Sequence, residues 1–94
     1  MREVKLSGRE RAVIKAIDEA SGSTGQEIHE RSNIAADELS DVLNGLVNSG
    51  YLEAYAPGES LPLVQEIREE NALASRYELN PSYTFEIRAA MRRT

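Results

Sequence analysis

The sequence predicts an α+β fold, mostly helical, with three helices, a two-stranded antiparallel ribbon and a terminal helix. Two helix-capping patterns occur early in the chain, and apolar residues repeat at helical spacing as far as Asn48. After Gly50 the repeat changes to alternation, which is typical of a strand. The 94 residues are 40% hydrophobic and 29% charged, so we expect residues 1–94 to form one globular domain.

The first two helices are each predicted by a capping box, in which a hydroxyl and a glutamate cap the first backbone amides. The Ser-Gly-Arg-Glu sequence at 7–10 predicts a helix over about 8–20. The Thr-Gly-Gln-Glu sequence at 24–27 predicts a second, short helix over about 25–32. The glycine-rich stretch at 22–25 is interpreted as a linker and cap.

Periodicity predicts the remaining regular elements. A helix over about 36–48 is followed by a strand over about 51–55, and its antiparallel partner is a short alternating run over about 76–79. A terminal helix is predicted over about 83–93. Apolar residues on one face of the third helix define the core side, namely Leu39, Val42, Leu43, Leu46 and Val47.

The insertion at 56–75 separates the two predicted strands. Its 20 residues are too many for a structureless hairpin loop in a compact domain. A helix capped by Ser60 is therefore predicted inside it, and a long wing without a helix is the alternative. Three residues would form the apolar side of that helix, namely Leu63, Val64 and Ile67.

The order of these elements resembles that of the winged helix-turn-helix superfamily of small transcriptional regulators. The resemblance rests on Thr-Gly-Gln-Glu-Ile at 24–28, Asn-Ile at 33–34, the apolar spacing of the third helix and Gly-Tyr-Leu at 50–52. It covers roughly residues 7–80. It implies that the third helix enters a major groove of DNA and that the wing touches phosphates or the minor groove.

The charge distribution does not follow this implied role. Residues 1–31 carry six basic and six acidic groups, and residues 68–94 carry five basic and four acidic groups. Residues 32–67 carry six acidic groups and no basic group, and we call them the acidic block. The three stretches together give the net charge of -5. The acidic block covers the third helix and the first strand. Phosphate binding depends on Lys and Arg, so the block opposes DNA binding through these elements.

The sequence therefore favours a non-enzymatic regulatory or adaptor domain that acts through protein–protein interaction. In this prediction, the acidic outer face of the third helix meets a basic surface on a partner protein, and the insertion supplies apolar anchors. The candidate residues are Asp37, Glu38, Asp41, Leu61, Leu63, Val64 and Ile67.

The alternative prediction is a DNA-binding transcriptional regulator, which would be dimeric. Ser40 and Asn44 would then contact base edges. The nearest cations for phosphates are Lys5, Arg9, Arg11, Arg31 and Arg76. Terminal helices dimerise many regulators of this superfamily, which makes three apolar residues candidate dimer contacts, namely Phe85, Ile87 and Met91.

Other function classes are disfavoured by composition. The chain has no cysteine and one histidine, so neither a thiolate metal site, a disulfide nor a histidine pair is expected. No catalytic constellation, cofactor motif or metal-ligand spacing is apparent. The sequence has neither an apolar run of membrane-spanning length nor a signal-peptide pattern at its start, and we expect a cytoplasmic protein.

Overall fold

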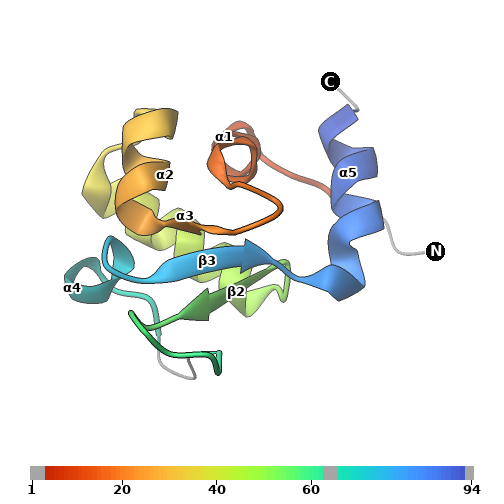
Figure 1. The fold of residues 1–94 in the computed structure, drawn as a ribbon. Coiled ribbons are helices and arrows are strands. Elements are labelled where there is room, and N and C mark those ends of the chain that lie inside the picture. The colour runs from red at the N-terminus through yellow and green to blue at the C-terminus, as the bar shows by residue number, and fades with distance from the viewer. Residues whose placement is uncertain (1–3, 63–65, 93–94) are drawn as a thin grey trace.

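The computed structural model describes residues 4–62 and 66–92, in which helices pack against a small three-stranded sheet (Figure 1). The sheet has the antiparallel order β1-β3-β2. Helices α1 and α2 lie beside each other, α3 crosses behind the sheet in this view, and α5 stands at one side. In chain order the elements are α1 (Gly8–Ala16), β1 (Ser23–Thr24), α2 (Gly25–Ser32), α3 (Ala36–Asn48), β2 (Leu52–Tyr55), α4 (Glu69–Ala72), β3 (Arg76–Leu79), η1 (Pro81–Tyr83) and α5 (Thr84–Arg92).

Both predicted capping boxes are present. The Ser7 hydroxyl accepts the amide of Glu10 at 3.2 Å, and the Glu10 carboxylate accepts the amide of Ser7 at 2.8 Å. Thr24 and Glu27 make the same pair of bonds at 3.1 and 2.9 Å. These local bonds satisfy amides that have no partner inside the helix, which is why the starts of α1 and α2 were predictable.

Helix α1 ends at Ala16 and not, as predicted, near Ala20. Ile17 leaves the helix with an extended backbone, φ -89° and ψ 131°. The carboxylate of Asp18 then accepts the amides of Ala20 and Ser21 at 2.8 and 3.2 Å, and these bonds lower the pKa of Asp18. An aspartate that binds the following backbone in this way competes with helix continuation.

Strand β1 was not predicted, because the stretch at 22–25 was interpreted only as a linker and cap. Ser23 lies opposite Tyr77 and Thr24 lies opposite Arg76, so the short β1 pairs with the edge of β3 that β2 does not occupy. A two-residue strand has no period to detect, and its pairing depends on a partner more than fifty residues away in sequence.

The helix expected from Ser60 to Ile67 is not found in the described part of the insertion at 56–75, and a single turn, α4, begins at Glu69 instead. The amide of Ile67 donates to the side-chain oxygen of Asn44 on α3 at 3.1 Å. This long-range bond holds the segment before α4 against α3 in a non-helical conformation. Two of the predicted apolar residues lie outside the described residues, namely Leu63 and Val64.

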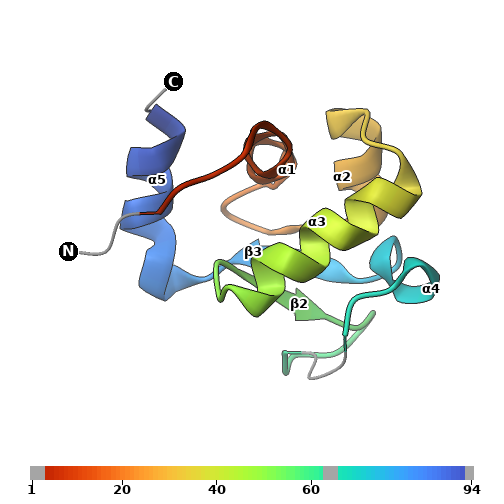
Figure 2. The same ribbon diagram turned by 180° about the vertical axis from the view of Figure 1, so that it is seen from behind.

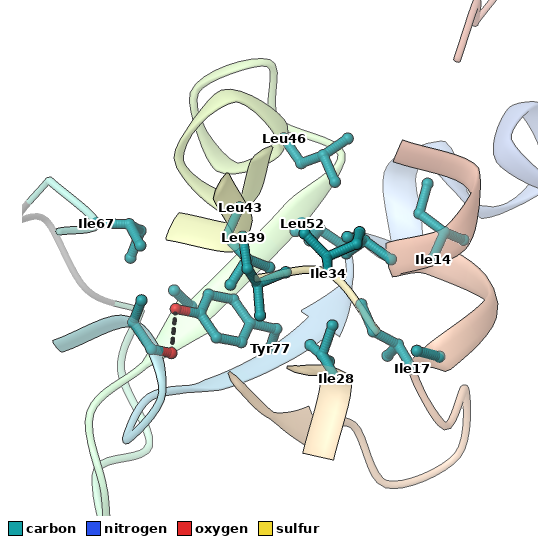
Figure 3. Packing of buried hydrophobic residues seen from close by; sticks show 14 of the residues in the cluster. Ile14, Ile17, Ile28, Ile34, Leu39, Leu43, Leu46, Leu52, Ile67 and Tyr77 are labelled. Carbon is teal, nitrogen blue, oxygen red and sulfur yellow. Dashed lines mark hydrogen bonds between the residues drawn. The ribbon is translucent and has the colours of Figure 1, made fainter. Parts of the chain in front are cut away.

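One hydrophobic core joins the helices to the inner face of the sheet (Figure 3). Tyr77 of β3 is fully buried in it, and its hydroxyl donates to the carbonyl of Ala72 at 2.8 Å. Burial raises the pKa of Tyr77 to about 12. The residues labelled around it are Ile14, Ile17, Ile28, Ile34, Leu39, Leu43, Leu46, Leu52 and Ile67.

Two backbone hydrogen bonds hold the N-terminus of α2 against the turn that follows α4. The amide of Gly25 donates to the carbonyl of Ser75 at 2.9 Å, and the amide of Gln26 donates to the carbonyl of Leu73 at 3.0 Å. A Cβ on Gly25 would lie 1.9 Å from the carbonyl oxygen of Ala72, which no side chain can tolerate. Glycine at this position therefore lets the end of the insertion approach α2.

The terminal helix lies where the sequence predicts it, but a 3-10 turn precedes its α-helical part. This turn is η1, and the side chain of Asn80 accepts the amide of Ser82 at 3.0 Å. Helix α5 is described as far as Arg92, so residue 93 of the prediction lies outside the described part. Figure 2 shows α5 and α4 at opposite ends of the molecule.

Candidate nucleic-acid interface

The outer face of α3 is acidic, as the sequence predicts. Asp37, Glu38 and Asp41 are all exposed on it. The carboxylate of Asp37 accepts the amide of Glu38 at 2.9 Å, so part of this charge serves the helix N-terminus. No Lys or Arg belongs to α3, and the face therefore presents negative charge to any ligand.

A groove of about 410 Å³ runs between this face and the insertion. Its lining has five carboxylates and one guanidinium, that of Arg68, which pairs with Glu66 at 3.4 Å. An anionic backbone would be repelled from this groove. The lining residues are Asp37, Glu38, Ser40, Asp41, Asn44, Glu66, Ile67, Arg68 and Glu69.

The two residues predicted to contact base edges differ in their surroundings, because Ser40 is buried and Asn44 is half-buried. Ser40 is 3% exposed, and its hydroxyl donates to the carbonyl of Asp37 at 2.8 Å. The side-chain oxygen of Asn44 accepts the amide of Ile67. Helix spacing placed both side chains near the outer face, but the hydroxyl of Ser40 is bound to the helix backbone and the side-chain oxygen of Asn44 is bound to the insertion.

Most of the predicted phosphate-binding cations are bound to other groups. Arg9 pairs with Glu38 at 3.3 Å. Arg76 pairs with Glu78 and lies over the ring of Tyr55, 4.7 Å from its centroid. These cations are neutralised locally, which weakens their attraction for phosphate.

Arg31 is also engaged, and its role is structural. Its guanidinium donates to the carbonyl of Ala16 at 2.9 Å and to the hydroxyl of Ser23 at 3.1 Å, and it pairs with Glu27 at 3.5 Å. It caps the C-terminal end of α1 and ties that end to β1 and α2.

Four cations have no carboxylate partner among the described residues, and all four lie along the junction of α1 with α5. Lys5 and Arg11 line one cleft of about 210 Å³ together with Ala90 of α5. Lys15 and Arg92 line a second cleft of about 370 Å³, whose floor is apolar. We call this surface the α1–α5 seam and define it by Lys5, Arg11, Lys15 and Arg92.

The carboxylates beside the seam are engaged. Glu19 accepts two hydrogen bonds from Arg88, one of 2.8 Å, and this guanidinium lowers the pKa of Glu19. The Glu10 carboxylate caps the amide of Ser7. Sequence reasoning missed Lys15 and Arg92 as candidate ligand contacts, although the four-residue spacing of Arg11 and Lys15 places them on one helix face.

The predicted apolar contacts separate into exposed and buried residues. Leu61 is 77% exposed, whereas Ile67 is 4% exposed and packs in the core, so Ile67 is not a surface anchor. Phe85 is 64% exposed, whereas Ile87 is 1% exposed and is not available to a second copy in this fold. Met91 packs at the edge of the core. The sequence shows that these residues are apolar, but the helical pattern did not predict which of them are buried in the core and which are exposed.

Neither a metal site nor a membrane span is found in the described part of the chain. Within residues 4–62 and 66–92, no three His, Cys, Asp or Glu side chains are placed to hold a metal ion. None of the helices described there is long and apolar enough to cross a membrane.

The helix order, the turn between α2 and α3 and the β2–β3 ribbon define a winged helix-turn-helix domain, as the sequence predicted. Among solved structures, the crystal structure of a MarR family transcription regulator is similar over 93% of this chain, with a TM-score of 0.64 and 20% sequence identity. The alignment covers 50% of that regulator, so the chain spans about half its length. Comparisons with protein-family models and with curated proteins find no match.

Proposed function

We propose that this chain is a non-enzymatic, DNA-binding winged-helix domain of the kind found in transcriptional regulators. The observation that carries the proposal is the similarity of almost the whole chain to half of a MarR family transcription regulator. Composition alone favours protein interaction, whereas the fold favours DNA. The seam cations, which have no carboxylate partner among the described residues, supply the positive charge that a DNA ligand requires.

The charge distribution limits the strength of this binding. Each phosphate contact contributes about 0.9 to the slope of log affinity against log salt, so the four cations of the seam correspond to a slope of about -3.6. Non-specific complexes of this kind have dissociation constants of about 10⁻⁴ to 10⁻⁶ M at physiological salt. We therefore expect weak, strongly salt-dependent binding for a single copy.

The test is a fluorescence-anisotropy titration of a short labelled duplex with the full chain, repeated over a series of salt concentrations. Saturable binding at low salt that weakens with a slope near -3.6 supports the proposal. Competition by unlabelled duplex controls for binding to the dye. A chain that is folded, but leaves the anisotropy unchanged at the highest soluble concentration in low salt, refutes DNA binding.

The acidic groove favours a second candidate function, the binding of a basic segment of a partner protein. Asp37, Asp41 and Glu69 line this groove, and no unpaired cation among the described residues enters it. An arginine-rich labelled peptide should bind, and Asp41→Asn should weaken its binding. Glu53→Gln on β2, outside the groove, is the matched control. Equal binding by the two variants would exclude the groove.

A further inference from the structure

We propose that the α1–α5 seam, and not the outer face of α3, contacts the phosphate backbone of duplex DNA. This inference rests on the DNA binding proposed above and specifies the face that performs it. The observation behind it is the separation of charge in the folded chain. Among the described residues, the cations without carboxylate partners lie on the seam, and the acidic groove lies between α3 and the insertion.

The two charged surfaces approach each other at α1, where Glu38 of the groove pairs with Arg9, and they extend from there toward opposite ends of the molecule (Figure 2). The groove reaches Glu69, the first residue of α4, whereas the seam reaches Arg92 at the end of α5. These two helices lie at opposite ends of the molecule (Figure 2), whose longest dimension is 34 Å. Screening at physiological salt reduces interactions over more than about 8 Å. Carboxylates at the α4 end of the groove therefore repel DNA bound at the α5 end of the seam only weakly.

The spacing of the seam cations suits a polyanion. Arg11 and Lys15 are four residues apart on α1, which corresponds to about 6 Å along the helix axis. Phosphates of one DNA strand advance by about 3.4 Å along the duplex axis, so the two cations span roughly two nucleotides. Lys5 shares a cleft with Arg11, and Arg92 shares a cleft with Lys15. The four groups thus form two pairs, each lining its own cleft, and the two pairs are connected through the shared face of α1.

Carboxylates beside the seam reduce its charge only in part. Glu19 is neutralised by Arg88, whereas Glu10 keeps its negative charge because its partner, the amide of Ser7, is neutral. The acidic residue of α5, Glu86, has an interaction of its own. On the α3 side the carboxylates are in excess, because five of them line the groove with one guanidinium, and Arg9 of α1 is paired with Glu38.

The lining of the seam favours a duplex backbone over a single strand. Proteins that bind single strands stack the bases on aromatic side chains. Neither cleft of the seam is lined by a described aromatic residue. Phosphate contacts carry no direct sequence information, so binding through the seam should be independent of sequence.

The experiment compares two double variants of the full chain by the same duplex titration and salt series. In the seam variant, Arg11→Gln and Lys15→Gln remove two of the four cations. In the α3 variant, Asp37→Asn and Asp41→Asn remove two carboxylates from the groove. All four side chains lie on helix surfaces and none is in the core, and thermal unfolding checks that each variant is folded.

The seam variant should bind at least about tenfold more weakly at low salt, and the salt slope should fall in magnitude by about 1.8, which is 0.9 for each lost contact. The α3 variant should change affinity by less than about threefold and leave the slope unchanged. Two duplexes of unrelated sequence should bind equally to the wild-type chain.

The failures of the two proposals are distinguishable. A wild-type chain that does not bind DNA refutes DNA binding itself. A chain that binds DNA with an unchanged slope in the seam variant overturns the assignment of the face, as does a large change in the α3 variant. Polyglutamate that competes as well as duplex DNA would show that the seam is a site for acidic protein segments, and would overturn the assignment to a nucleic-acid backbone.

Discussion

Gly25 offers the sharpest test of how the insertion is held to the rest of the fold. The substitution Gly25→Ala adds a methyl group 1.9 Å from the carbonyl oxygen of Ala72 and 2.7 Å from the Cα of Leu73. These are backbone atoms, which cannot move aside as the end of a flexible side chain can. The turn after α4 must shift away from α2 to accommodate the methyl group.

The loss in the free energy of unfolding can be estimated from the contacts that such a shift breaks. Two buried or partly buried backbone hydrogen bonds, from Gly25 to Ser75 and from Gln26 to Leu73, contribute about 0.5–1.5 kcal/mol each. Overpacking destabilises the folded state by a further amount of about 1–3 kcal/mol. The better helix propensity of alanine stabilises it by at most about 1 kcal/mol. These contributions together span about 1–6 kcal/mol, and from the middle of that range we expect Gly25→Ala to lower the free energy of unfolding by about 2–4 kcal/mol.

The assay is urea and thermal unfolding followed by circular dichroism. For a domain of this size, a loss of about 2–4 kcal/mol lowers Tm by roughly 10–30 °C. The matched control is Gly45→Ala, because Gly45 lies in the middle of α3 and a methyl group added there would have nothing within 4 Å. This variant should gain about 0.5–1 kcal/mol. If Gly25→Ala is as stable as the wild-type chain, the close approach of the insertion to α2 is wrong.

Three further predictions concern the core, the insertion and a cap. Burial raises the pKa of Tyr77 to about 12 from an ordinary 10.0, so this tyrosine ionises at lower pH in the unfolded chain than in the folded chain. The free energy of unfolding should therefore fall between about pH 10 and 12. Tyr77→Phe should remove much of that fall and cost about 1–2 kcal/mol at neutral pH, as measured by urea unfolding at a series of pH values. Ile67→Ala should cost about 2–4 kcal/mol and Leu61→Ala less than about 0.5 kcal/mol, and equal losses would contradict their burial. Thr24→Ala should cost about 1 kcal/mol through the lost cap of α2, and no change in Tm would count against that cap.

The elements that the sequence predicted correctly depend on local interactions. Capping boxes join residues three apart, and the apolar face of α3 follows from helical spacing alone. The errors occurred where distant residues or a local turn decide the conformation. Asp18 ends α1 early by capping its own turn, and Ile67, which was expected in a helix, is held against α3 by Asn44 in a non-helical conformation. Neither competition between a turn and a helix nor a contact between distant segments is visible in a periodic pattern.

The candidate site shows the same division. Counting charges along the chain identified the acidic face of α3 correctly, because exposure of that face follows from the helix period. It did not identify which cations are free, since pairing of Arg9 with Glu38 and of Arg88 with Glu19 joins residues far apart in sequence. It also named Ser40 as a possible base contact, although the folded chain buries that side chain and binds its hydroxyl to the carbonyl of Asp37.

The sequence by itself determined the winged-helix order of elements, the starts of two helices and the acidic character of α3, because each depends on neighbours within one or two helical turns. Only the tertiary structure decided that Gly25 must be glycine, that Ile67 and Ile87 are buried, and that the unpaired cations of the described residues gather on the α1–α5 seam. These features depend on contacts between residues that are distant in sequence. Such contacts form only when the core packs, and the packing also determines which charges are paired and which stay exposed to solvent.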